Sequence, residues 1–376
     1  MKKAYKFLPA ALFLIFIVGM MILFFVLPKK EYSSSEKRYL EQAPKFSFQS
    51  LLSGDFGEDF EKFLSDQTAG RNFWVGLSAY YNYAIGNNGS NGIYKCHEDY
   101  LVNDPEKMDD LGRNIGYINE FAAKCPVDTT VMVAPSTGYI CDDILPAVHK
   151  QYRDDEMFPE MTQELSAAKF IDIREAFKNE YAAGNQIYYK TDHHWTAYGA
   201  YTAYRELAKE LGYTPHAKED YTVTEYPDFY GTTYSSSGFW LTPPDTVEIW
   251  DNPANDSTVV TTITDNGEVT EQKDMFYLGH LEDDDKYPIY LDGNHPYTVI
   301  KNSAATSDEK LLVIKDSFAH SLVPYLADHY SEIVMVDLRY YSQPVSRLVE
   351  SEGIDRVLVV YSIDNLATDT NLGWLE

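Results

Sequence analysis

A carboxylate and two imidazoles stand side by side in the stretch KTDHHWT, residues 190–196. An aromatic, strand-like run (186–189) precedes it, and a segment of helical periodicity (195–211) follows it and ends at a glycine. α/β enzymes usually keep their chemistry at such junctions of strand and helix. We therefore predict that Asp192 and His194 are the acid and the base of a catalytic triad.

The spacing of the motif suits this role. On extended backbone, side chains i and i+2 project to the same side, so Asp192 and His194 would pair while His193 points away. The carboxylate then holds one imidazole nitrogen and leaves the other free as a general base. General-base catalysis of this kind raises a reaction rate by roughly 10²- to 10⁴-fold. Two alternatives remain open: Asp192 caps the helix that begins near Trp195, or the three side chains bind zinc. Adjacent histidines diverge and no further ligand motif is apparent, so we predict no metal site and no cofactor.

Ser317 is the predicted nucleophile. It follows the apolar, strand-like run 311–314 and lies on the turn into a helical segment, 318–329. On such a turn the hydroxyl projects above the edge of the sheet, where free N–H groups and the helix dipole can support an oxyanion. The alternative is that this Asp-Ser pair only caps the helix; His320 and Ser321 are rival participants.

Two further polar residues follow predicted strands at the same edge of the sheet. Arg339 comes after the strand 332–336, and Asn365 comes after the strand 356–360. An asparagine amide can donate to an oxyanion, and an arginine can bind substrate or brace the site. We predict both, together with His193, as oxyanion or substrate-binding residues; the alternative is that they satisfy backbone groups of their loops.

The N-terminal segment bears on the location of the protein. Lys2, Lys3 and Lys6 precede an uncharged run, 7–27, which is long enough to cross a hydrocarbon core roughly 30 Å thick at about 1.5 Å per residue. No small-residue cleavage site follows, so we predict an uncleaved signal anchor (1–30) in the cell membrane, with a cytoplasmic tail and an extracellular body. The alternative is a cleaved signal peptide.

Composition narrows the function. The formal net charge of −27 is spread along the chain and disfavours nucleic-acid binding. The 31 tyrosines suit a sugar-binding cleft, and equally any amphipathic surface. The three cysteines are too few, and odd in number, for a disulfide framework; Cys125 and Cys141 pair, or all are free thiols.

The periodicities divide the chain into three parts. Aromatic-rich helices in 31–90 follow the anchor and are interpreted as a helical stalk. Strands and helices then alternate through the body, 91–376, which indicates a parallel sheet in an α/β fold. Within the body, helical periodicity disappears over about 220–306 and turn residues become frequent, so we predict a β-rich insertion or lid there.

The motif resembles the one that gives the DHHW proteins of Gram-positive bacteria their name. Shorter stretches share the resemblance: Arg38–Leu40, Phe60–Asp66, Gly70–Asn72, Asn91–Tyr94, Tyr234–Gly238, Gly293–Pro296 and Lys315–Ser317. These proteins are similar to the periplasmic alginate acetylation proteins and to SGNH hydrolases in circularly permuted order, with acid and base before the serine.

The resemblance implies a three-layer, SGNH hydrolase-like fold with Ser317 as nucleophile, His194 as base and Asp192 as its orienting acid. Asn365 falls where the SGNH pattern has an oxyanion asparagine. The chain departs from that pattern because one residue, not two, separates acid from base, and because the oxyanion glycine has no clear counterpart.

These features lead to one main hypothesis. The protein is predicted to be a membrane-anchored O-acetyltransferase that acts outside the cytoplasm on a cell-surface or exported polysaccharide. The resemblance further implies a multi-spanning membrane partner that supplies the acetyl group. The alternatives are a polysaccharide acetylesterase with the same triad and a non-catalytic polysaccharide-binding or assembly protein.

Overall fold

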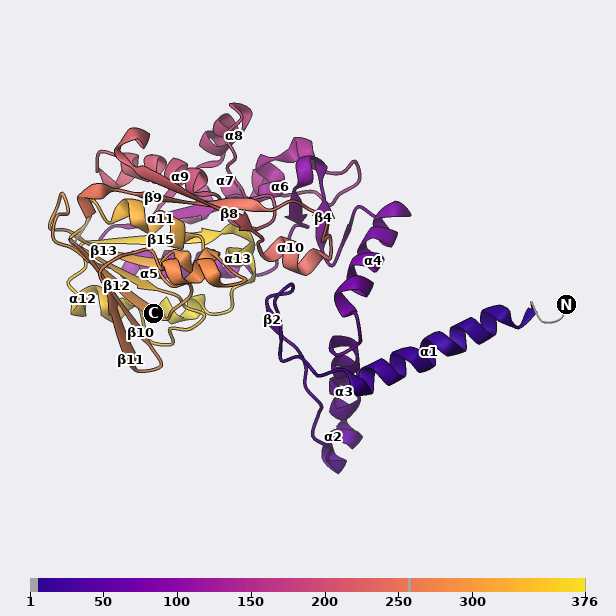
Figure 1. Ribbon diagram of the computed structural model, residues 1–376. Helices are drawn as coiled ribbons and strands as arrows, with labels where there is room; N and C mark the ends of the chain where they lie inside the picture. Colours follow the sequence, from indigo (N-terminus) through magenta and orange to yellow (C-terminus); the bar gives the residue numbers. More distant parts are fainter. Residues whose placement is uncertain (1–5, 256–257, 376) are drawn as a thin grey trace. The chain divides into compact units, whose positions relative to one another are not determined.

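The computed structural model describes residues 6–255 and 258–375, and the chain forms two compact units (Figure 1). Unit 1 comprises the chain up to Ser90 together with Ser235–Leu241. Unit 2 comprises Asn91–Tyr234 and the chain from Thr242 onward. All the predicted site residues belong to unit 2.

Unit 1 begins with an apolar helix. Its elements are α1 (Leu8–Val26), β1 (Tyr32–Ser33), β2 (Arg38–Tyr39), α2 (Phe48–Ser53), α3 (Asp55–Asp66), α4 (Arg71–Ala84) and β3 (Gly89–Ser90). Among the described residues, α1 is the one helix long and apolar enough to cross a membrane, with a mean hydropathy of 2.8. A membrane anchor and a signal sequence both meet this criterion. The Arg38 guanidinium ties β2 to the end of α3 by donating to both oxygens of Asp66, at 2.6 and 2.9 Å.

Unit 2 is a mixed α/β fold around a sheet with eight strands in the described part of the chain. The strand order is β11-β10-β12-β14-β13-β15-β6-β7. The five strands β14, β13, β15, β6 and β7 are parallel, and β12, β10 and β11 extend them antiparallel. The bounds of the eight strands are β6 (Thr129–Ala134), β7 (Lys169–Ile171), β10 (Val259–Asp265), β11 (Glu268–Gln272), β12 (Tyr297–Asn302), β13 (Lys310–Lys315), β14 (Glu332–Val336) and β15 (Arg356–Ser362).

Helices cover both faces of this sheet (Figure 1). In β13, Leu311 and Val313 belong to one core cluster and Leu312 and Ile314 to the other, as the period of two in a strand requires. The helices are α5 (Leu111–Lys124), α6 (Thr137–Ile140), α7 (Asp154–Glu164), α8 (Arg174–Ala182), α9 (Ala197–Leu211), α11 (Ala319–Leu326), α12 (Ser346–Ser351) and α13 (Ile363–Thr368), with α10 (Thr232–Ser237) containing residues of both units. Those packed on the first cluster include α8, α9 and α11, and those on the second α5, α7, α12 and α13.

The segment predicted as a β-rich insertion, 220–306, is divided between two structures. Its strands β10, β11 and β12 join the central sheet, whereas β8 (Thr222–Phe229) and β9 (Asp245–Asp251) form a separate antiparallel ribbon. A short hairpin, β4 (Ile93–Lys95) and β5 (Leu101–Asn103), opens unit 2. A third apolar cluster packs the ribbon against the turn at Tyr287 and against Tyr189, immediately before the DHHW motif. The segment therefore helps to position the motif.

Candidate active site

The DHHW motif lies on a bend, not on extended backbone as predicted. Tyr188 and Trp195 form an isolated antiparallel bridge, and residues 191–194 turn between them. Asp192 and His194 still lie side by side because one carboxylate oxygen accepts the backbone N–H of His194 at 2.9 Å as well as contacting its ring nitrogen. Backbone and side chain together fix the pair.

His193 does not point away from this pair, so that expectation is wrong. Its ring lies 3.9 Å from the ring of His194, centroid to centroid, and its Nδ1 is 2.6 Å from the hydroxyl oxygen of Thr232. The bend removes the alternation of an extended strand and turns both imidazoles to the same side. Burial and the neighbouring His194 lower the pKa of His193 to about 4, which leaves its ring neutral at neutral pH.

The helix after the motif is capped by another residue. Thr196 is the N-cap of α9, and its Oγ1 accepts the N–H of Gly199 at 3.1 Å. The alternative in which Asp192 only caps this helix is therefore wrong.

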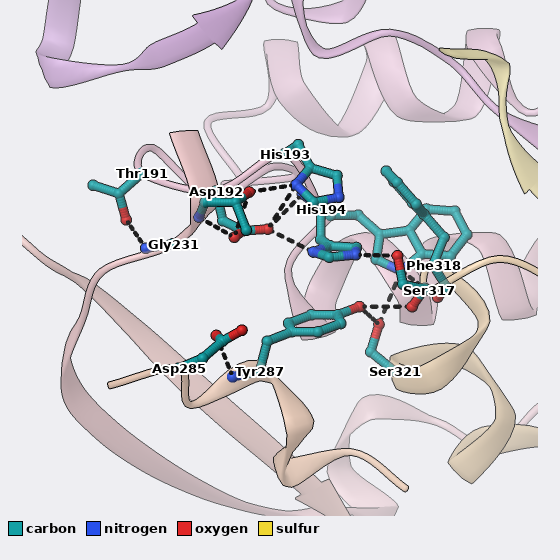
Figure 2. A network of polar contacts seen from close by, with 12 residues as sticks. Thr191, Asp192, His193, His194, Gly231, Asp285, Tyr287, Ser317, Phe318 and Ser321 are labelled. Atoms are coloured by element: carbon teal, nitrogen blue, oxygen red, sulfur yellow. Dashed lines mark hydrogen bonds and ion pairs between the residues drawn. The ribbon is translucent and has the colours of Figure 1, made fainter. Parts of the chain in front are cut away.

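Asp192, His194 and Ser317 form one buried chain of hydrogen bonds (Figure 2). His194 Nδ1 is 2.5 Å from Asp192 Oδ1, and His194 Nε2 is 2.7 Å from Ser317 Oγ. With Nδ1 donating to the carboxylate, Nε2 is the acceptor for the serine proton. This arrangement can activate a serine hydroxyl as a nucleophile.

The Asp192 carboxylate remains ionised despite its burial. Its second oxygen accepts the backbone N–H of Thr232 at 2.7 Å and the hydroxyl of Thr232 at 3.2 Å. Burial opposes ionisation, but the positive charge that His194 can carry and the hydrogen bonds from His194 and the Thr232 backbone outweigh it and hold the pKa of Asp192 well below its usual range. The carboxylate is thus available to stabilise a protonated His194.

Tyr287 completes the surroundings of the base. Its ring stacks on His194 with a centroid distance of 3.8 Å and an interplanar angle of 7° (Figure 2). Its hydroxyl donates to the carbonyl of Ser317 at 3.3 Å. A cation over an aromatic face is stabilised, so this ring favours the imidazolium that forms when His194 takes a proton.

Asp245 anchors the motif from β9. Its carboxylate accepts the backbone N–H of Thr191 at 2.7 Å, the hydroxyl of Thr191 at 2.6 Å and the backbone N–H of Lys190 at 3.1 Å. The ribbon thereby fixes the residue that precedes the catalytic acid.

Ser317 lies where β13 ends, as predicted. The preceding Asp316 accepts three donors from the end of β15 and the turn after it: the backbone N–H and hydroxyl of Ser362, at 2.8 and 3.0 Å, and the side-chain amide of Asn365, at 2.7 Å. Asn365 therefore lies at the predicted edge and braces the serine turn. Its role as an oxyanion donor stays a prediction.

Arg339 also lies at this edge, and its guanidinium is engaged. It donates to both oxygens of Asp337, at 2.8 and 2.6 Å, and to the side-chain oxygen of Asn294 at 2.9 Å. Asp337 in turn binds the buried ammonium of Lys315 at 2.9 Å. Arg339 thus braces a buried ion pair, and its contact with substrate stays a prediction.

The rival residues have other partners. Ser321 Oγ accepts the indole N–H of Trp195 at 2.9 Å, and His320 Nε2 is 2.7 Å from the ammonium nitrogen of Lys315. Neither contacts the hydroxyl of Ser317 among the bonds of the described residues. All three cysteines are free thiols, so of the two alternatives the unpaired one holds.

The acid and the two imidazoles also lie close enough to be considered as metal ligands. Their candidate atoms are within 4.8 Å of one another. Zinc bonds of about 2.0–2.1 Å at tetrahedral angles would place ligand atoms roughly 3.3 Å apart. The distance of 2.5 Å between Asp192 Oδ1 and His194 Nδ1 leaves no room for such an ion and is that of a direct hydrogen bond.

Sequence reasoning missed three of the residues that position the triad: Thr232, Asp245 and Tyr287. All three lie in or beside the β-rich segment, far along the chain from the motif. Turn and strand composition there carries no signal of which side chain meets the motif. The one signal in the sequence that could have pointed to a contact between this segment and the motif is the acidic residue Asp245 at the start of β9.

Comparisons with known proteins identify the family. The model of the family described as DHHW protein matches residues 149–336, half of the 376-residue chain, so the protein belongs to the DHHW family. A DHHW family protein from Eubacterium siraeum DSM 15702 has the same fold, with a TM-score of 0.63 at 21% identity over 76% of this chain and 95% of its own. No curated protein matches the chain.

PatB1 from Bacillus cereus is similar at higher identity. Its structure has a TM-score of 0.63 at 26% identity, over 72% of this chain and 96% of its own. A second structure of PatB1 carries a sulfonyl adduct, with a TM-score of 0.62 at 25% identity over 74% of this chain and 96% of its own.

Gly231 offers a test of how closely the acid is held. A Cβ added there would lie 2.1 Å from Asp192 Cβ and 2.3 Å from its Oδ2. We expect Gly231→Ala to displace the Asp192 carboxylate, to lower the free energy of unfolding by about 1–3 kcal/mol and to reduce turnover of an acetyl ester. Thermal unfolding and ester hydrolysis measure the two effects. Gly279→Ala, where nothing lies within 4 Å, is the matched control; equal behaviour of the two variants would show that the close approach is unimportant.

Proposed function

We propose that the protein is a membrane-anchored O-acetyltransferase with Ser317 as nucleophile, His194 as general base and Asp192 as the orienting acid. The buried chain of hydrogen bonds through these three residues carries the proposal. The sulfonyl adduct of the similar PatB1 supports it, because sulfonyl compounds react with activated serine hydroxyls. We also propose that unit 2 is a circularly permuted SGNH hydrolase-like domain, since the acid and base precede the serine.

The reaction has two half-reactions. His194 Nε2 takes the proton of Ser317, whose Oγ attacks the carbonyl carbon of an activated acetyl ester or thioester; the donor's alcohol or thiol leaves with the proton from His194. A sugar hydroxyl then gives its proton to His194 and attacks the acetyl ester. The acetyl group moves to the sugar oxygen, and Ser317 recovers its proton from His194.

The oxyanion of each tetrahedral intermediate needs donors near Ser317. The backbone N–H of Ser317 makes no hydrogen bond within the described residues, and Asn365 uses one amide hydrogen on Asp316. We assign the oxyanion to the Ser317 N–H and the second amide hydrogen of Asn365. His193 and Arg339 remain the candidates for contact with substrate.

The proposed location follows from α1. As an uncleaved anchor, α1 would hold unit 2 at the extracellular surface of the cell membrane, close to polysaccharide at the cell surface. Such a tether suits a multi-spanning membrane protein that delivers acetyl groups across the bilayer. The resemblance to alginate acetylation proteins supports polysaccharide as the acceptor.

The full chain in detergent micelles tests the function. We expect phenylmethylsulfonyl fluoride to modify Ser317, as identified by mass spectrometry of peptides. With p-nitrophenyl acetate as the acetyl donor, we expect the protein to acetylate a neutral oligosaccharide. Ser317→Ala should abolish both, while Ser351→Ala, an exposed serine at the end of α12, retains both. Ester cleavage without acetylated sugar would identify an acetylesterase instead. Folded parent protein that is neither modified nor active would favour a non-catalytic binding protein.

A further inference from the structure

A cavity of about 200 Å³ lies beside the triad in unit 2. Asp192, His193 and Phe318 form part of its wall, and the Phe318 ring is 4.9 Å from the ring of His194. Ligand pockets for drug-sized molecules have about 300–1,000 Å³, so this cavity has room for about one sugar ring and not for a chain. The cavity is therefore a candidate binding site for the group that reacts at Ser317.

The wall of the cavity is rich in polar groups at the ends of two parallel strands and in a nearby loop. They comprise Ser136 and Thr137 after β6, Ser362, Asp364, Asn365 and Thr368 at and after β15, and Asn103 and Glu106 at and after the end of β5. Tyr152 and Phe318 add aromatic faces. Hydroxyl, amide and carboxyl groups suit a ligand with several hydroxyls better than the methyl group of an acetyl. The cavity thus matches the acceptor more closely than the acyl group.

Two residues of this wall, Asp364 and Thr233, have a buried side-chain oxygen without a hydrogen bond among the described residues, and Asp364 is the acidic one. It lies in the first turn of α13, and its Oδ1 is buried without a hydrogen bond. A buried acceptor without a donor costs free energy, and a native structure needs a reason to keep one. A donor from a ligand in the cavity would supply that reason.

The charges around Asp364 are mostly negative. Burial, then the carboxylates of Asp154 and Glu106, raise its pKa to about 7. The titratable and charged groups facing it are Asp104 with its ion-pair partner Lys150, Glu106, Tyr152, Asp154 and Tyr188.

The cavity wall itself has no cationic group. No lysine or arginine is among the described residues that line it, and His193 is neutral at neutral pH. The carboxyls of Glu106, Asp192 and Asp364 all border it. A carboxylate or phosphate on a ligand would meet repulsion here, whereas a neutral hydroxyl would meet acceptors.

We propose that this cavity binds the acceptor sugar, that Asp364 accepts a hydrogen bond from one of its hydroxyls, and that uncharged sugars are selected over uronates and phosphorylated sugars. This inference rests on the proposed function of the triad. Asp364 is a binding residue in this scheme, and the reacting hydroxyl of the same ring is the one that faces Ser317.

Protection of Ser317 against phenylmethylsulfonyl fluoride tests the inference on the full chain in detergent micelles. The labelling rate is measured with and without chitotriose, maltotriose and mannotriose as uncharged probes and trigalacturonate as the anionic probe. We expect at least one uncharged sugar to slow labelling and trigalacturonate to have no effect. In Asp364→Asn, the sugar concentration for half-protection should rise about tenfold. Asp128→Asn, an exposed carboxyl elsewhere, leaves labelling and protection unchanged.

A pH series separates binding by Asp364 from a merely structural effect. In the parent, half-protection should need more sugar at about pH 6 than at about pH 8. The Asp364 carboxyl, with a pKa of about 7, becomes protonated as the pH falls from about 8 to about 6, and the neutral carboxyl accepts a weaker hydrogen bond than the carboxylate. Taking the ratio of rates with and without sugar at each pH cancels the titration of the triad. Asp364→Asn should remove the dependence.

The outcomes separate the inference from the function on which it rests. If Ser317 is labelled but none of the three uncharged sugars protects it, if trigalacturonate protects equally well, or if Asp364→Asn behaves as the parent, the inference is overturned and the triad stands. If folded protein is not labelled at Ser317, the proposed function fails and the inference fails with it.

Discussion

Ser317→Ala is expected to lower the rate of acetyl transfer by about 10⁶-fold, the scale measured when a serine hydrolase loses its nucleophile. In the proposed mechanism Ser317 Oγ carries the acetyl group, and its removal leaves His194 Nε2, now 2.7 Å away, without a proton to accept. His194→Ala should cost about as much, because the two side chains act as a unit. For the same reason, the double variant should be no slower than either single one.

Asp192→Asn should have a smaller effect, about 10⁴-fold. An amide in place of the carboxylate can present its N–H to His194 Nδ1 at the 2.5 Å contact, which favours the wrong tautomer of the base. Single-turnover release of p-nitrophenol from p-nitrophenyl acetate measures all four variants, with circular dichroism to verify folding. A folded Ser317→Ala protein that still forms an acetyl-enzyme would contradict the assignment of the nucleophile.

The sheet could be read from the sequence because its strands are continuous apolar runs. The predicted strand 332–336 coincides with β14, and the predicted strand 311–314 lies within β13; every residue of both predicted strands is buried. Strands covered by helices on both faces are apolar throughout, so their limits show in composition alone. The positions of Ser317, Arg339 and Asn365 at one edge follow from the parallel order of β13, β14 and β15.

The local geometry of the site could not be read in the same way. Extended backbone would have paired Asp192 with His194 and sent His193 away, but the carboxylate accepts the backbone N–H of His194 and closes a bend. The partners of Asp192 and His194 beyond the motif, Thr232 and Tyr287, come from a segment of irregular composition. Hydrophobic periodicity predicts where helices and strands lie and which of their faces are buried, but it carries no information on such contacts between distant polar side chains.

Asp337→Ala is expected to lower the free energy of unfolding by about 3–5 kcal/mol, since it leaves a buried charge without its counterion. Asp337 and Lys315 are 0% and 2% exposed, and their charged atoms are 2.9 Å apart. The variant also removes both carboxylate contacts of Arg339. Denaturant unfolding of the full chain in detergent, followed by tryptophan fluorescence, measures the loss. Glu206→Ala, which breaks the surface pair of Glu206 with Lys209 on α9, should cost less than about 0.5 kcal/mol and is the control.

The same pair predicts a pH dependence. Burial opposes the ionisation of Asp337, but the hydrogen bond from Arg339 and the charge of Lys315 outweigh it and lower the pKa of Asp337 below its ordinary value of 3.8. A depressed carboxyl pKa gives stability that is present above the unfolded-state value and is lost as the pH falls through the folded-state value. The unfolding free energy of the parent should therefore fall more steeply below about pH 4 than that of Asp337→Asn. Replacing both partners, Lys315→Met with Asp337→Leu, should restore the part of the stability that the unpaired charge of Lys315 removed, because the ion pair is then lost together with its desolvation cost. A loss for Asp337→Ala no larger than that for Glu206→Ala would contradict this account of a buried, ionised pair.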